Sequence, residues 1–161
     1  MTLGLIAALA LSQVDRGSRS GLFGYFMPYQ LVADGQNGSF MEKDVVIATT
    51  TVQWDRMRSK LGIDDDKNKT LTDLHGPLGA MDWTREQVVF ARTPEYPTGG
   101  YSASLFKLTM EPHGDWKIEL AVSAPPPGSA VIQMLTRPYV VFRMRQTEGK
   151  PWLIVHSPKP Q

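Results

Sequence analysis

Alternating apolar and polar positions dominate the second half of the chain and predict antiparallel β-structure. Residues 102–110 and 116–122 each alternate with a period of two, and the turn sequence "EPHGD" between them predicts a hairpin. Shorter runs rich in β-branched and aromatic residues predict further strands at 29–33, 45–48, 88–91, 137–145 and 152–156.

One segment, residues 51–61, changes to the helical period. Thr50 is a suitable N-cap, and the side chain of Gln53 can return a hydrogen bond to the backbone N–H of the cap residue. Gly62 can adopt the left-handed conformation that ends a helix. The apolar face of this helix is expected to be buried and consists of Trp54, Met57 and Leu61.

These elements predict an α+β fold that is predominantly antiparallel β. We expect one sheet, with a barrel or a sandwich as the alternative forms of closure, packed by the single amphipathic helix. The polar stretch 64–81 is interpreted as a long loop. The helix is expected to cover a face lined by Val88, Phe106, Trp116, Ile118, Leu120 and Phe142.

The start of the chain has the features of an export signal. An apolar run extends from Leu3 to Leu11 and is far too short to span a bilayer, and the small residues Ala10 and Ser12 provide a signal-peptidase site before Gln13. We therefore predict a signal peptide over residues 1–12 and an extracytoplasmic (periplasmic or secreted) location. A first strand, and a late start inside a longer signal, are the alternative interpretations.

The remaining length suits a single domain. The chain has 161 residues, of which 42% are hydrophobic, and this is enough to bury a core. We predict a linker at 13–21, one domain over 22–157 and a frayed tail at 158–161.

Charge adds little to this picture. The formal net charge is +1, and a basic surface interleaved with aromatic residues is missing, so neither nucleic acid nor an anionic membrane is an expected partner. From residue 137 onward the chain is locally basic, which is typical of a protected edge strand or of a docking patch. The charged residues of this segment are Arg137, Arg143, Arg145, Lys150 and Lys159, against Glu148.

The residues that carry most metal and catalytic chemistry are scattered. There is no cysteine, and the three histidines lack companions at metal-ligand spacing. A calcium-like loop begins at Asp64, but Lys69 replaces its glycine and His75 replaces its bidentate glutamate. No serine lies in a nucleophile motif. We therefore expect no catalytic residue, no metal and no cofactor.

Four motifs occur in a specific order: "DWT" (82–84), "PTGGYS" (97–102), "PPPG" (125–128) and "QMLTRPY" (133–139). With this order the chain resembles the PrcB C-terminal-like family from about Tyr25 to about Arg145. The family is named for a subunit that stabilises an exported, surface-associated bacterial protease complex.

The resemblance implies a non-enzymatic module that binds or stabilises a protein partner, such as an exported protease, with no stable membrane insertion and no nucleic acid. The glycines of "PTGGYS" are typical of a tight turn that the backbone alone requires. The functional alternative is a rim of loops that meets the partner. The predicted rim consists of Pro97, Thr98, Gly99, Gly100, Tyr101, Pro126, Gly128, Arg137 and Tyr139.

Two further functions stay open at this point. "PTGGY" and "RPY" are similar to loops of the chagasin-like cysteine-protease inhibitors, although the spacing here is shorter. A small-molecule or glycan binder would use the aromatic rings of Tyr101, Tyr139 and Trp83.

Overall fold

The predicted hairpin is the centre of a four-stranded sheet in the computed structural model, which describes residues 24–63, 72–74 and 80–158. Strands β6 (Ser102–Met110) and β7 (Trp116–Ser123) pair antiparallel. Strand β1 (Tyr25–Phe26) adds antiparallel to β6, and β9 (Pro151–His156) adds parallel to β7. The strand order is therefore β1-β6-β7-β9.

The other strands form a second, five-stranded sheet in the order β3-β5-β8-β2-β4, with each neighbouring pair antiparallel. The strand β4 lies inside the stretch predicted to be a loop, so that part of the loop prediction was wrong. A short 3₁₀ helix, η1 (Gly38–Phe40), follows β2. The bounds are β2 (Tyr29–Gly35), β3 (Val45–Ala48), β4 (Thr72–Leu74), β5 (Glu86–Arg92) and β8 (Tyr139–Arg145).

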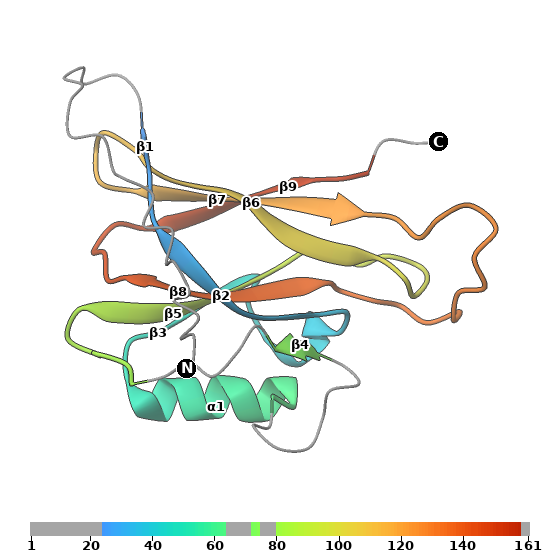
Figure 1. Ribbon diagram of the computed structural model, residues 1–161, viewed down its shortest axis with the longest axis horizontal. Coiled ribbons are helices and arrows are strands. Elements are labelled where there is room, and N and C mark those ends of the chain that lie inside the picture. The colour runs from blue at the N-terminus through green and yellow to red at the C-terminus, as the bar shows by residue number, and fades with distance from the viewer. Residues whose placement is uncertain (1–23, 64–71, 75–79, 159–161) are drawn as a thin grey trace, which may run out of the picture.

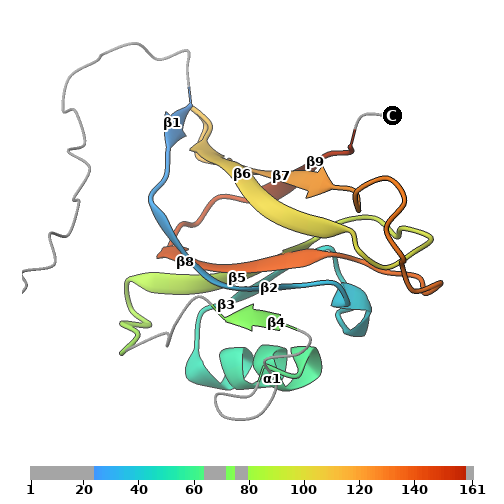
Figure 2. The same cartoon turned by 45° about the vertical axis from the view of Figure 1, so that its right-hand side comes forward.

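The two sheets pack face to face, as Figure 2 shows. The core between them contains Trp116, which is fully buried, and its indole N–H donates to the carbonyl oxygen of Gly149 at 2.7 Å. The α+β, mostly antiparallel class is thus confirmed. Of the predicted forms of closure, the sandwich agrees with the two stacked sheets, and the described strands form no closed barrel. The inter-sheet core includes Val89, Leu105, Leu108, Trp116, Ile118, Leu120, Val140 and Phe142.

Helix α1 (Thr51–Leu61) covers the outer face of the five-stranded sheet (Figure 1). Met57 is 2% exposed and packs in a second core with Val88 and Phe90. Both faces of this sheet are therefore buried, one under the helix and one under the other sheet. Trp54 packs at the edge of the second core and is partly buried, so the expectation that it is buried holds only in part.

The face predicted to lie under the helix divides among three environments. Val88 does face the helix, whereas Trp116, Ile118, Leu120 and Phe142 fill the core between the sheets. Phe106 is 65% exposed, because the β6–β7 register shifts between Leu105 and Lys107. Such a bulge adds a residue to one strand and reverses the alternation beyond it.

The ends of the helix follow the predicted capping chemistry with one difference. Thr50 Oγ1 accepts a hydrogen bond from the backbone N–H of Gln53 at 3.3 Å, and Gly62 is left-handed with φ 65°. The Gln53 side chain instead accepts from the backbone N–H of Thr49 at 2.7 Å, one residue before the predicted donor.

The packing of the helix can be tested at Met57. We expect Met57→Ala to lower the free energy of unfolding by about 2–5 kcal/mol, because the truncation leaves a cavity against a stiff sheet. The exposed neighbour Arg56 provides the control, and Arg56→Ala should change stability by no more than about 0.5 kcal/mol. Equal effects of the two substitutions in denaturant melts would show that the helix does not pack on the sheet.

Candidate functional site

Two loops meet at one end of the molecule, and we call them together the rim: residues 93–101, after β5, and residues 124–138, before β8. The end of β5 pairs with the start of β8, Arg92 opposite Tyr139, so both loops join this sheet at the same end of its strands. Figure 1 shows them on the right, away from the β6–β7 turn on the left.

The rim loops are joined by backbone hydrogen bonds. Tyr96 and Thr136 form an antiparallel bridge, with N–H to O distances of 2.8 and 2.9 Å. Beyond the bridge, the backbone N–H of Gly99 donates to Ile132 O at 2.8 Å. The Thr136 hydroxyl donates to Thr98 O at 2.8 Å. The prediction that "PTGGYS" and "TRPY" are neighbours is confirmed.

The "PPPG" segment completes this end by packing on "PTGGYS". Gly100 has φ 84°, and a Cβ there would lie 2.9 Å from Pro125 Cβ. Gly128 has φ 78° in a turn closed by a hydrogen bond from Ser129 N–H to Pro126 O at 3.1 Å. Gly99 is buried against Ile132, and its φ is not positive. Both positive-φ glycines of the rim are thus required by its geometry.

The two predicted rim tyrosines occupy different environments. Tyr101 is half-buried and stacks on Tyr96, with ring centroids 4.4 Å apart. Tyr139 is 1% exposed and packs against Phe90 in the core beneath the helix. Its inclusion in the binding rim does not agree with the structure, because strand β8 turns this ring inward.

Sequence reasoning missed the most exposed apolar residues of the rim. Ile132, Met134 and Leu135 are 72%, 47% and 60% exposed. A signal for them does exist in the sequence. These three large apolar side chains fall within four residues, outside any alternating pattern and between two proline breaks.

A cavity of about 580 Å³ lies at the base of the rim, between the edges of the two sheets. Its charged residues form two ion pairs: Arg92 with Asp44 at 2.9 Å, and Arg137 with Glu95 at 3.2 Å. Leu153 and Val155 of β9 form its apolar wall. Arg137 is the one predicted site residue that belongs both to the rim and to this cavity.

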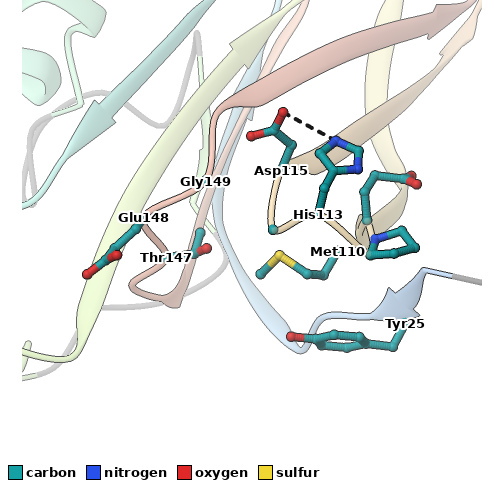
Figure 3. A pocket seen from close by; sticks show the side chains of 10 residues that line it. Tyr25, Met110, His113, Asp115, Thr147, Glu148 and Gly149 are labelled. Carbon is teal, nitrogen blue, oxygen red and sulfur yellow. Dashed lines mark ion pairs between the residues drawn. The ribbon is translucent and has the colours of Figure 1, made fainter. Parts of the chain in front are cut away.

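A second cavity of about 640 Å³ lies at the opposite end, where the β6–β7 turn meets the loop before β9 (Figure 3). Its one ion pair among the residues drawn joins His113 Nε2 and Asp115 Oδ2 at 3.4 Å. Asp115 also accepts from the backbone N–H of Lys150 at 2.9 Å. A Cβ on Gly149 would overlap the carbonyl of Gly114, so the two loops pack in direct backbone contact. The residues that line this cavity therefore have a structural role, because their contacts hold the two loops against each other.

The "DWT" motif also lies away from the rim, at the start of β5. Hydrogen bonds from the Thr84 hydroxyl and backbone N–H lower the pKa of the Asp82 carboxyl. The Arg143 guanidinium binds both oxygens of Glu86 at 2.6 Å and lowers the pKa of that carboxyl. Trp83 packs at the margin of the core beneath the helix. Tyr101, Tyr139 and Trp83 are therefore not brought together, and the structure does not support the glycan site built from these three residues.

The outer face of the four-stranded sheet exposes aromatic rings that already have cationic neighbours. Lys107 Nζ lies 5.1 Å from the ring centroid of Phe26, and Lys117 Nζ lies 5.9 Å from that of Trp152. His156 contacts the Phe106 ring edge-on, at a centroid distance of 5.5 Å. His156 also hydrogen-bonds Glu119 at 2.8 Å, and this contact lowers the pKa of the Glu119 carboxyl. These contacts within the sheet distinguish this face from the exposed apolar residues of the rim.

Among the described residues, no group of three His, Asp or Glu side chains is arranged to hold a metal ion. The described part of the chain also contains no helix with the length and apolar character needed to cross a membrane. The predicted signal peptide, the linker and most of the calcium-like loop lie outside the described residues.

Comparison with known proteins identifies one family. Residues 88–145 match the family described as PrcB C-terminal. The match begins within β5, ends with β8 and contains "PTGGYS", "PPPG" and "QMLTRPY", whereas "DWT" precedes it. No curated protein and no solved structure shows significant similarity to the chain.

The packing of the rim predicts a difference between two glycines. Gly100→Ala should destabilise the fold more than Gly128→Ala, because the added Cβ meets Pro125, whereas at Gly128 it meets open space. Each substitution carries the strain of a positive φ, about 1–3 kcal/mol, so Gly128→Ala serves as the matched control. Equal losses in thermal or denaturant melts would contradict the packing of "PPPG" on "PTGGYS".

Proposed function

Since residues 88–145 match the PrcB C-terminal family, we propose that this chain is a non-enzymatic, extracytoplasmic module that binds a partner protein through its rim. The class of partner that the family favours is an exported protease or a protein of its complex. The export part of the proposal comes from the apolar run at residues 3–11 and the small residues Ala10 and Ser12 at its end.

The observation that carries the proposal is the combination of exposed apolar side chains with a cross-linked backbone. Ile132, Met134 and Leu135 are exposed on a loop that is tied to its neighbour at Thr136 and Ile132. An interface gains affinity when its anchors are ordered before binding, because less conformational entropy is lost on association. A tied loop with solvent-exposed apolar anchors meets this condition.

A second role, inhibition of a protease, is supported by one observation. The "PTGGY" and "RPY" segments lie side by side at one end of a β-scaffold, joined through Tyr96 and Thr136. Neighbouring loops on a stiff scaffold can insert together into a cleft. Addition of the purified chain to a co-purified protease distinguishes the two roles, since an inhibitor lowers proteolysis and a stabilising subunit preserves it.

Rim binding is tested by matched substitutions of exposed apolar residues. The bait is the full chain, added to the extracytoplasmic fraction of the organism that makes it. We expect Leu135→Asp to weaken capture of the partner at least about tenfold, because it places a charge in the apolar contact. Phe106→Asp is the control, since Phe106 is 65% exposed on the outer sheet face and Leu135 is 60% exposed.

Both variants should keep the melting temperature within about 3 °C of the unmodified chain, since surface substitutions rarely cost more than about 0.5 kcal/mol. If only Phe106→Asp abolishes capture of the partner, the binding surface is the outer face of the four-stranded sheet and not the rim. Capture that neither substitution alters would rule out the rim.

A further inference from the structure

Two arginines and two carboxylates line the cavity at the base of the rim. The Arg92 side chain is 8% exposed and that of its partner Asp44 is 70% exposed, so the charge of Arg92 lies much deeper than the charge that offsets it. The Arg137 side chain is 33% exposed, close to the 41% of its partner Glu95. An anion entering the cavity would therefore meet a buried guanidinium group at Arg92 and would compete with Glu95 for Arg137.

Arg92 is held in place by its own contacts. Its Nη1 donates to the carbonyl oxygens of Gly38 and Met41 at 3.0 and 2.6 Å, and its Nε donates to Asp44 at 2.9 Å. These contacts position Arg92 as a fixed charge at the cavity wall. Water screens the well-exposed carboxylate of Asp44, so that carboxylate offsets the charge of Arg92 only in part.

Arg137 has donor capacity that its neighbours leave unused. Its backbone is pinned, since its N–H donates to Gln36 O at 2.9 Å and its carbonyl oxygen accepts from Gly38 N–H at 2.8 Å. Its Nη2 lies 3.2 Å from Glu95, while its Nε is buried and has no hydrogen-bond partner among the residues that the structure describes. A buried N–H without a partner is costly, and few remain so in native proteins.

We propose that this cavity binds a carboxylate group of the partner protein, together with the aliphatic carbons of the residue that carries it. Glu95 leaves Arg137 and turns to solvent, and the Arg137 side chain moves so that its Nε, which is buried in the unbound protein, faces the cavity. The carboxylate then takes the Nε–Nη edge of Arg137 in the bidentate geometry that guanidinium groups favour, and the aliphatic carbons of its residue pack on Leu153 and Val155. This inference rests on the proposed function, since Arg137 and Glu95 belong to the rim that meets the partner.

The carboxylate could come from the C-terminus of a chain or from an acidic side chain. Three probes separate these sources: N-acetyl-leucine carries a terminal carboxylate, N-acetyl-glutamate amide carries a side-chain carboxylate, and N-acetyl-leucine amide carries none. Each is titrated into the full chain at fixed pH and ionic strength. Binding is followed by NMR at the Arg137 Nε–H and at the methyl groups of Leu153 and Val155.

We expect at least one carboxylate probe to shift the Arg137 Nε–H and the methyl signals, with a dissociation constant of about 1 mM, as suits so small a ligand. The amide of leucine should bind at least about tenfold more weakly. Preference for either carboxylate probe identifies the source of the group. Equal binding of N-acetyl-leucine and its amide, or no shift at Arg137 with either carboxylate, would overturn the proposal.

Two substitutions and one control sharpen this test. Arg137→Gln should weaken the carboxylate probe at least about tenfold, while Glu95→Gln should strengthen it about threefold, because it removes the competing carboxylate. Arg145→Gln changes an exposed arginine at the end of β8 and should leave binding unchanged. Weaker binding in Glu95→Gln would contradict the exchange of carboxylates. If the cavity binds a carboxylate probe but the rim captures no partner, the proposed function is wrong and the cavity proposal stands. If the rim captures a partner but the cavity binds no carboxylate probe, the cavity proposal is wrong and the proposed function stands.

Discussion

The backbone pairing of Tyr96 with Thr136 is the contact on which the rest of this end of the molecule depends. It holds side by side two loops that are some forty residues apart in the sequence. It also places the backbone N–H of Gly99 within hydrogen-bond distance of Ile132 O. With the loops held there, Gly100 adopts a positive φ against Pro125, and Arg137 is left at the edge of the sheets facing Glu95. The exposed apolar residues between 132 and 135 therefore stand on an ordered frame, which is the property that a preorganised binding surface needs.

The fold could be predicted from the sequence wherever an element has one buried face and one face exposed to solvent. The hairpin of β6 and β7 was readable because its outer positions are polar, and α1 was readable from Thr50, Gly62 and the spacing of Met57 and Leu61. The sequence did not decide between a single sheet, a barrel and a sandwich, because β5 and β8 are buried on both faces. A continuous apolar run does not show which residues face which side of a sheet. Phe106 was misplaced for a related reason, since a bulge reverses the alternation without leaving a mark in the pattern of residue types.

The candidate site was predictable to the same degree. Proline and glycine breaks beside tyrosines located the rim. Of the two adjacent glycines in "PTGGYS", Gly100 has the positive φ that such a turn requires. Tyr139 was assigned to the rim because it follows a proline, but the register of β8 turns it into the core. The cavity was beyond prediction, because Arg92, Arg137 and Leu153 come from three separate segments and meet only when the two sheets stack. Side-chain pairs such as Arg137 with Glu95 carry no local sequence signal.

A preorganised binding surface must be ordered in the protein on its own, before any partner binds. Amide hydrogen exchange of the isolated full chain measures this directly at the backbone N–H groups of Tyr96, Gly99 and Thr136, which are the donors of the rim hydrogen bonds. We predict that these three amides exchange at least about a hundredfold more slowly than exposed loop amides, because an opening that frees them must break the pairing between the loops. Exchange of all three at the rate of an unstructured peptide would show instead that the rim becomes ordered only on binding.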